Sequence, residues 1–208
     1  MQSTPRWIAP LCLAAVALAP AVVHAQAQSV QTQGQAVDQS VPPPVVDPRT
    51  LSEKERRAYA DTLREARQDI DRKQFDTAIA SLDKLIVAHP REPQARFMKG
   101  LAQADAGRRD DAMSTFLALL ADYPELPEPR NNLAVLYAQK GEYAQAREEL
   151  EMALRAAPDY AVAHENLADV YARLAAEHYE RAAALDKRNK TAPAKLKLVR
   201  EVTAAPTP

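Results

Sequence analysis

The residues that most often carry out chemistry are few in this sequence and lie far apart. His164 and Glu165 stand side by side, but the second histidine that a zinc-protease helix requires is missing. His89 and His178 lie in other segments of the chain, so no metal-binding group forms. The sequence holds no Gly-x-Ser-x-Gly turn and no phosphate-binding Gly-Lys-Ser/Thr loop. We therefore expect no catalytic residue, no metal, no cofactor and no enzymatic activity.

The N-terminus has the pattern of a secretory signal. Arg6 supplies a positive start, residues 7–23 are mostly apolar, and small residues lead up to Ala25. We expect cleavage after Ala25, so that residues 1–25 are a signal peptide and the protein is periplasmic or secreted. The alternative is a retained anchor, which Pro10 and Pro20 disfavour because they interrupt a run that is short for a membrane span. No stable membrane span is expected after cleavage.

Composition excludes several classes of partner. The only cysteine, Cys12, lies in the expected signal, so the exported chain cannot form a disulfide. The formal net charge is −1, which argues against a general binder of polyanions. Aromatic residues make up 5% of the chain, too few for a surface on which bases stack. We expect no nucleic-acid partner.

Residues 26–50 are rich in glutamine and proline and show no helical period. They are predicted to form a disordered linker that holds the folded part away from the processing site. The proline run at 42–44 could alternatively be a ligand for a proline-reading domain. Order is expected to begin near Ser52, because Ser52 and Glu55 have the spacing of a helix capping box.

The following segment repeats at a constant interval, which is the spacing between Ala78 and Ala112. A small residue, a large apolar residue one turn later, a glycine in a turn and a proline at a helix end recur in register. The series are Ala78, Ala112 and Ala146; Leu82, Phe116 and Leu150; Phe75, Arg109 and Tyr143; Gly107 and Gly141; Pro90, Pro124 and Pro158. Series in register are the sequence signature of a repeat protein.

These positions resemble the tetratricopeptide repeat, a family also found in exported bacterial proteins. The resemblance covers about residues 59–185 and is weakest in the first unit, where Thr62, Glu65 and Asp69 replace large or apolar residues. It implies an all-α fold, a right-handed α-solenoid of antiparallel helix pairs, with about three units in a domain spanning 51–188. Helices are expected at about 53–71, 75–88, 93–106, 109–121, 127–139 and 143–156.

The fourth unit departs from this pattern. Asn166, Leu167 and Tyr171 begin it in register, but the apolar residues that follow come about five residues too early; they are Tyr179, Ala182 and Leu185. The turn between helices is missing, and no glycine or proline interrupts the segment. We predict one long helix over 161–187, with a hairpin turning near Ala175 as the alternative.

The C-terminal tail is basic, with several lysines and arginines between 187 and 200. Residues 189–203 are predicted to form a short amphipathic capping helix that closes the array, and 204–208 to be disordered. The alternative for the helix is contact with an anionic surface.

A binding face follows from the resemblance, since the first helices of successive units line a groove in this family. The corresponding residues here are Leu63, Arg67, Ile70, Phe97, Leu101, Asn131, Val135, Glu165 and Asp169. The apolar members would either hold an apolar side of a peptide or simply pack between helices. Asn131 would be available to the backbone of a peptide, and Glu165 and Asp169 would attract a basic residue.

The resemblance and the composition together indicate a class of function. We expect a scaffold that binds a protein or peptide segment in envelope protein assembly. The alternative is a periplasmic binder of a small apolar or lipid-like ligand, which would need an enclosed cavity. The sequence leaves the identity of the partner and the oligomeric state open.

Overall fold

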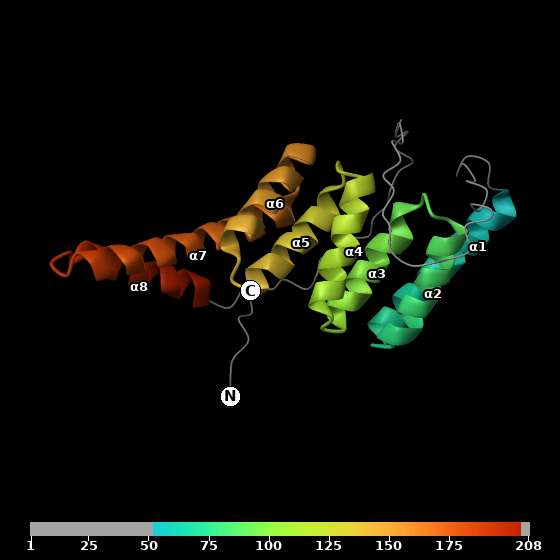
Figure 1. Ribbon diagram of the computed structural model, residues 1–208, viewed down its shortest axis with the longest axis horizontal. Helices are drawn as coiled ribbons and strands as arrows, with labels where there is room; N and C mark the ends of the chain where they lie inside the picture. The colour runs from blue at the N-terminus through green and yellow to red at the C-terminus, as the bar shows by residue number, and fades with distance from the viewer. Residues whose placement is uncertain (1–51, 205–208) are drawn as a thin grey trace, which may run out of the picture. The chain divides into compact units, whose positions relative to one another are not determined.

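The computed structural model describes residues 52–204, and all regular secondary structure in that range is helical (Figure 1). The expected signal peptide and linker, and the tail after Ala204, lie outside the described residues. The helices are α1 (Glu53–Asp71), α2 (Phe75–Ala88), α3 (Pro93–Asp105), α4 (Arg109–Asp122), α5 (Pro127–Gln139), α6 (Tyr143–Ala156), α7 (Ala161–Leu185) and α8 (Thr191–Ala204). The six repeat helices predicted from the sequence are confirmed, with ends that differ by at most one residue.

The described chain divides into two compact units. In residues 52–123, α1 packs on α2, α2 on α3 and α3 on α4, and α1 also touches α3. In residues 124–204, the same order holds from α5 to α8, and α5 also touches α7. Within each unit, every helix therefore contacts its neighbour in sequence, and the first helices of successive pairs contact each other, as expected for stacked helix pairs.

The first helix begins where the sequence predicted. The Oγ of Ser52 accepts a hydrogen bond from the backbone N–H of Glu55 at 3.3 Å, and Oε2 of Glu55 accepts one from the backbone N–H of Ser52 at 2.7 Å. The two bonds form a complete capping box, which satisfies donors that the first turn of a helix otherwise leaves unpaired.

The residues of the repeat series form the cores of the two units. Ala78, Ala112 and Ala146 are each fully buried, and so are the large apolar residues one turn after them. In the first unit, the close approach of α3 and α4 depends on Gly100, because a Cβ atom placed there would overlap the ring of Phe116. The repeat register is therefore a register of core positions.

The turn inside each helix pair has the same geometry three times. Gly107 and Gly141 have φ of +77° and +79°, and Lys73, at the equivalent position of the first pair, has φ of 61°. Each turn closes with the two hydrogen bonds of a Schellman motif, such as Gly107 N–H to the carbonyl of Ala104 at 2.9 Å and Arg108 N–H to that of Gln103 at 2.8 Å. The positive φ explains why glycine recurs at this position, and Lys73 is the exception.

The join between successive pairs also repeats. The side chains of Arg96, Arg130 and His164, which occupy equivalent positions in successive units, bond to the carbonyl oxygens of Pro90, Pro124 and Pro158 respectively. The nitrogen-to-oxygen distances are 2.5, 2.9 and 2.9 Å. Each bond satisfies a carbonyl beyond the end of one helix with a side chain from the first turns of the next.

The long helix expected in the fourth unit is confirmed. α7 is one uninterrupted helix of 25 residues that ends at Leu185, so the alternative of a hairpin near Ala175 is wrong. α8 lies where a short helix over 189–203 was expected, and it folds back along the second half of α7 (Figure 1). Arg200 of α8 pairs with Glu180 of α7, and Nζ of Lys195 lies 5.8 Å from the ring centroid of Tyr179.

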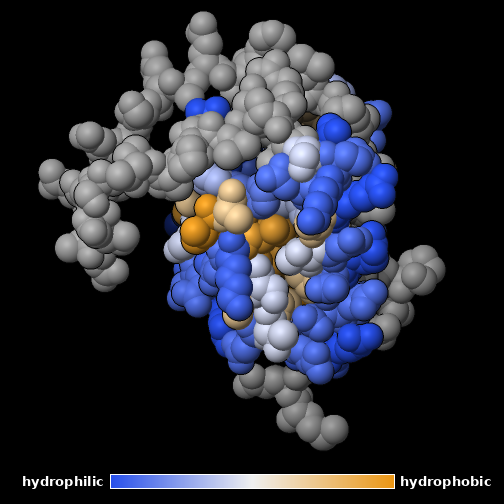
Figure 2. Space-filling view, turned by 90° about the vertical axis from the view of Figure 1, so that its right-hand side faces the viewer, coloured by the Kyte–Doolittle hydropathy of each residue, from blue (hydrophilic) through white to orange (hydrophobic). Residues whose placement is uncertain are grey.

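The surface near α1 and α2 is mainly hydrophilic, with one small hydrophobic group (Figure 2). Of the helices between residues 52 and 204, none is long and apolar enough to cross a membrane.

Candidate protein-binding surface

The predicted groove residues of the first unit come from α1 and α3 and differ in exposure. Leu63 and Arg67 are half-buried, whereas Ile70 and Leu101 retain 4% and 1% of their accessible surface. Phe97 is 8% exposed, and its ring centroid lies 5.9 Å from that of Phe116. Ile70, Leu101 and Phe97 therefore pack between helices, which was the alternative to a role in holding a peptide. Leu63 and Arg67 keep surface that a partner could contact.

The second unit contributes a buried amide pair. Asn131 of α5 is 1% exposed, and its Oδ1 accepts a hydrogen bond from Nδ2 of Asn166 in α7 at 2.8 Å. The expectation that Asn131 offers its amide to the backbone of a peptide does not fit this arrangement, because the amide is enclosed and already bonded. Val135, one turn further on α5, is 8% exposed. The sequence analysis missed the role of Asn166, although it occupies the repeat position of Asn132.

Two carboxylates remain accessible on α7. Glu165 is exposed and Asp169, one turn later on the same face, is half-buried. Partial burial raises the pKa of Asp169 above its usual value, Glu165 raises it further by repulsion, and Arg173 one turn on lowers it. A positive group placed between the two carboxylates would relieve both the burial cost and the repulsion.

The first unit has a charged pair of its own on the groove side. Asp105, at the end of α3, keeps an exposed side chain, but desolvation by its neighbours raises its pKa, and the positive charge of Arg67 on α1 opposes that shift. Asp105 is absent from the predicted set, which stopped at its apolar neighbours. The signal that could have found it is the repeat itself, since Asp71 and Asp105 are equivalent residues at the ends of α1 and α3.

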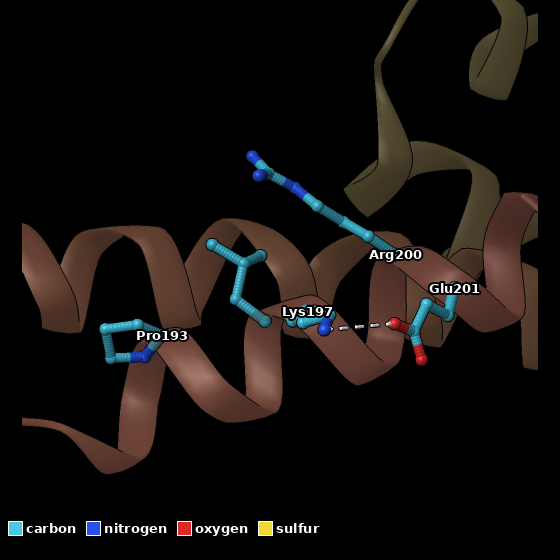
Figure 3. A pocket seen from close by; sticks show the side chains of 5 residues that line it. Pro193, Lys197, Arg200 and Glu201 are labelled. Atoms are coloured by element: carbon cyan, nitrogen blue, oxygen red, sulfur yellow. Dashed lines mark ion pairs between the residues drawn. The ribbon is translucent and has the colours of Figure 1, made fainter.

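Two depressions lie on the surface of the described residues, and neither is enclosed. One lies on α8 and is lined by Pro193, Leu196, Lys197, Arg200 and Glu201, with Lys197 Nζ 3.9 Å from Oε1 of Glu201 (Figure 3). The other lies on the first turns of α1 and is lined largely by charged side chains. Within residues 52–204, no three histidine, acidic or cysteine side chains gather closely enough to hold a metal ion.

The protein is built from helix pairs whose core positions recur at a constant interval, and charged side chains lie on the first helices of these pairs. These features define a helical-repeat scaffold for protein interaction. Comparison of the sequence with family models supports this class. Two models of the tetratricopeptide repeat match residues 63–127 and 105–174, which together span more than half of the chain. The chain belongs to the tetratricopeptide repeat family, whose members generally bind protein partners and are typically not catalytic.

A solved structure shares the fold. TTC0263, a thermophilic tetratricopeptide repeat protein of Thermus thermophilus, superposes with a TM-score of 0.51 at 24% identity, over 67% of this chain and 81% of that one. MamA gives a TM-score of 0.49 at 20% identity, over 69% of this chain and 77% of its own. The Naa15/Naa10 complex bound to HypK-THB gives 0.48 at 15% identity, over 69% of this chain and 22% of that one. A search of curated protein sequences found no significant match.

Proposed function

We propose that this protein is an exported scaffold that binds a basic segment of a protein partner and acts in envelope protein assembly. The export part rests on the signal pattern that ends at Ala25. The binding part rests on the repeat family and on the acidic face of α7.

The observation that carries the proposal is the state of Asp169. Its carboxylate is half-buried and lies one turn from a second carboxylate, so its charged form is disfavoured in the unbound protein. A lysine or arginine side chain from a partner would stabilise both carboxylates at once. Carboxyl groups with perturbed pKa values cluster at functional sites, and Asp169 combines such a shift with a second, exposed carboxylate one turn away.

Arg67 and Asp105 extend the same argument to the first unit. They present both signs of charge on α1 and α3, beside the half-buried Leu63. This second face suits a segment with mixed charge and at least one apolar side chain. The alternative function, binding of a small apolar or lipid-like ligand, needs an enclosed apolar cavity, and neither depression described above supplies one.

A photo-crosslinking experiment tests where the partner binds. A photoreactive amino acid replaces Ala172, which lies one turn after Asp169 on α7 and leaves both carboxylates in place, in the full-length protein expressed with its own N-terminus. Cross-linked partners are identified by mass spectrometry. The control position is Glu148 on α6, which is acidic and exposed but does not lie on the first helix of a pair. We expect a discrete cross-linked partner from position 172 and none from position 148.

The contact segment of that partner is then synthesised and its affinity measured. Asp169→Lys should weaken binding at least tenfold, whereas Glu148→Lys, which changes the net charge equally, should leave it within twofold. Binding should also weaken as the pH falls through the raised pKa of Asp169, because the protonated carboxyl no longer attracts a cation. Equal cross-linking at both positions, or equal affinities of the two variants, would reject the α7 face as the binding site.

A further inference from the structure

One face of α7 carries a regular stripe that the binding proposal does not use. The stripe residues recur at alternating intervals of three and four, which keeps them on one side of a helix that packs against another helix. They are Ala168, Tyr171, Ala175, His178, Ala182 and Leu185. The stripe contains no aspartate, glutamate, lysine or arginine, and Asp169 lies on a different side of the helix.

The stripe is incompletely covered. Leu185 is 83% exposed and Tyr171 48% exposed, and Ala168 and His178 are also exposed. Ala175 and Ala182 are half-buried. The hydroxyl of Tyr171 bonds to Glu151 of α6 at 3.1 Å, which holds the ring in place while much of it stays accessible. A regular row of mostly apolar, partly exposed side chains indicates a packing surface.

The preceding repeat shows what the first half of this stripe normally contacts. Ala134 and Ala138 of α5 are 1% and 3% exposed, because α6 folds back on α5 and packs Ala146 and Leu150 against them. The counterpart of Ala134 one repeat later is Ala168, which is exposed. α5 ends in a turn, and α6 then folds back on it. α7 continues as one helix past the equivalent point, so the fourth repeat has no second helix that could cover this face.

The second half of α7 packs on α8, but its stripe residues are only partly covered. Because the turn between helices is missing, Ala153 of α6 corresponds to Ala182 of α7. Ala153 is fully buried, whereas Ala182 is only half-buried beside α8. The first half of α7 therefore corresponds to the first helix of a pair, and the second half corresponds to the second helix. Because both halves belong to one continuous helix, they cannot pack against each other.

We infer that a second copy of this chain covers the stripe, with the two α7 helices antiparallel about a two-fold axis near the middle of the helix. In that arrangement the first half of each α7 packs on the second half of the other. Each contact continues the interface that α5 and α6 form within one chain. A two-fold axis closes the assembly at two copies, because each copy uses the same face. No aspartate, glutamate, lysine or arginine of the stripe opposes the contact.

The mass of the purified chain, as processed by the host, tests this inference. We expect a dimer by sedimentation equilibrium at micromolar concentration. Ala168→Arg should raise the dimer dissociation constant at least tenfold, because two new charges would enter the contact. The matched control is Ala184→Arg, since Ala184 is an exposed alanine of the same helix on a different face. It should leave the dimer intact, and the two variants should have equal melting temperatures under dilute, monomeric conditions.

The orientation is tested with spin labels. The processed chain should have no cysteine, so single cysteines can be placed at will. Labels at position 185 should lie about 25 Å or more apart in an antiparallel pair, because each residue of helix adds about 1.5 Å on both sides of the axis. A monomeric parent chain, equal dissociation constants for the two arginine variants, or a short distance between the labels at 185 would each overturn the inference.

Discussion

Lys73 shows how a single residue departs from the repeat without changing the fold. It occupies the position of Gly107 and Gly141 and has the same left-handed backbone, with φ of 61°. A side chain with a Cβ atom is strained in this region by about 1–2 kcal/mol, and glycine is not. The hydrogen bonds of the turn, from Lys73 N–H to Ile70 and from Gln74 N–H to Asp69, hold it there.

Replacing Lys73 with glycine should therefore stabilise the protein. We expect Lys73→Gly to raise the free energy of unfolding by about 0.5–1 kcal/mol, since the relief of strain exceeds the added freedom of the unfolded chain. Lys73→Ala is the control, because it removes the same charge but keeps the Cβ atom, and it should bring no gain. Urea denaturation measures both. A gain from alanine equal to that from glycine would show that the charge is responsible.

Asp169 makes a pH-dependent contribution to stability. Its pKa is higher in the folded than in the unfolded protein, so the folded state binds more protons between the two values. This carboxyl therefore lowers stability as the pH rises through that window. Because solvent screens a half-buried group, Asp169→Asn should raise the free energy of unfolding at pH 7 by less than about 1 kcal/mol, with no effect well below both pKa values. Chemical denaturation at pH 7 and at a pH well below both pKa values checks this prediction. An equal effect of the substitution at the two pH values would exclude titration of Asp169 as the cause.

At the scale of elements, helix pairs are held by small residues at points of closest approach. Gly100 of α3 faces the ring of Phe116 of α4, which is fully buried and closely packed. The alanines of the repeat, Ala78, Ala112 and Ala146, are likewise small residues that are fully buried between helices. The joins depend on side chains instead, with Arg130 bonding both the carbonyl of Pro124 and, at 2.9 Å, the carboxylate of Glu149.

Gly100→Ala tests this close approach. Overpacking costs about 1–3 kcal/mol, and the better helical propensity of alanine offsets about 1 kcal/mol of it. We expect a net loss of about 1 kcal/mol in the free energy of unfolding. Phe116→Leu in the same chain should make room for the added methyl group. The double variant should then be more stable than the sum of the two single changes predicts, and strict additivity would mean that these residues do not meet.

At the scale of the whole molecule, the N-terminal address stays a prediction, because residues 1–51 lie outside the described part of the chain. The protein purified from the cell envelope fraction should begin at Gln26 or within a few residues of it, as intact-mass measurement can establish. Ala25→Arg should block processing and accumulate the precursor, since the cleavage site requires a small residue there. Envelope material from the parent chain that still begins at Met1 would indicate a retained anchor.

The sequence by itself determined the helices, their ends and the register of the core. Helical periodicity, proline and glycine act within a few residues, and the constant repeat interval places each helix against the next within a unit. It favoured an unbroken α7, because the deletion of a turn is visible in the spacing, but the structure excluded the hairpin alternative.

Only the tertiary structure decided which groove residues remain available. Phe97 and Asn131 have the spacing of surface residues on a first helix, yet Phe116 and Asn166 enclose them. The burial of a side chain depends on partners that lie on other helices, far along the chain in both cases. The periodicity of one helix shows which residues share a face. It does not show which faces another helix covers. Only the packing of the helices decided that Asp169 stays accessible while Asn131 is buried.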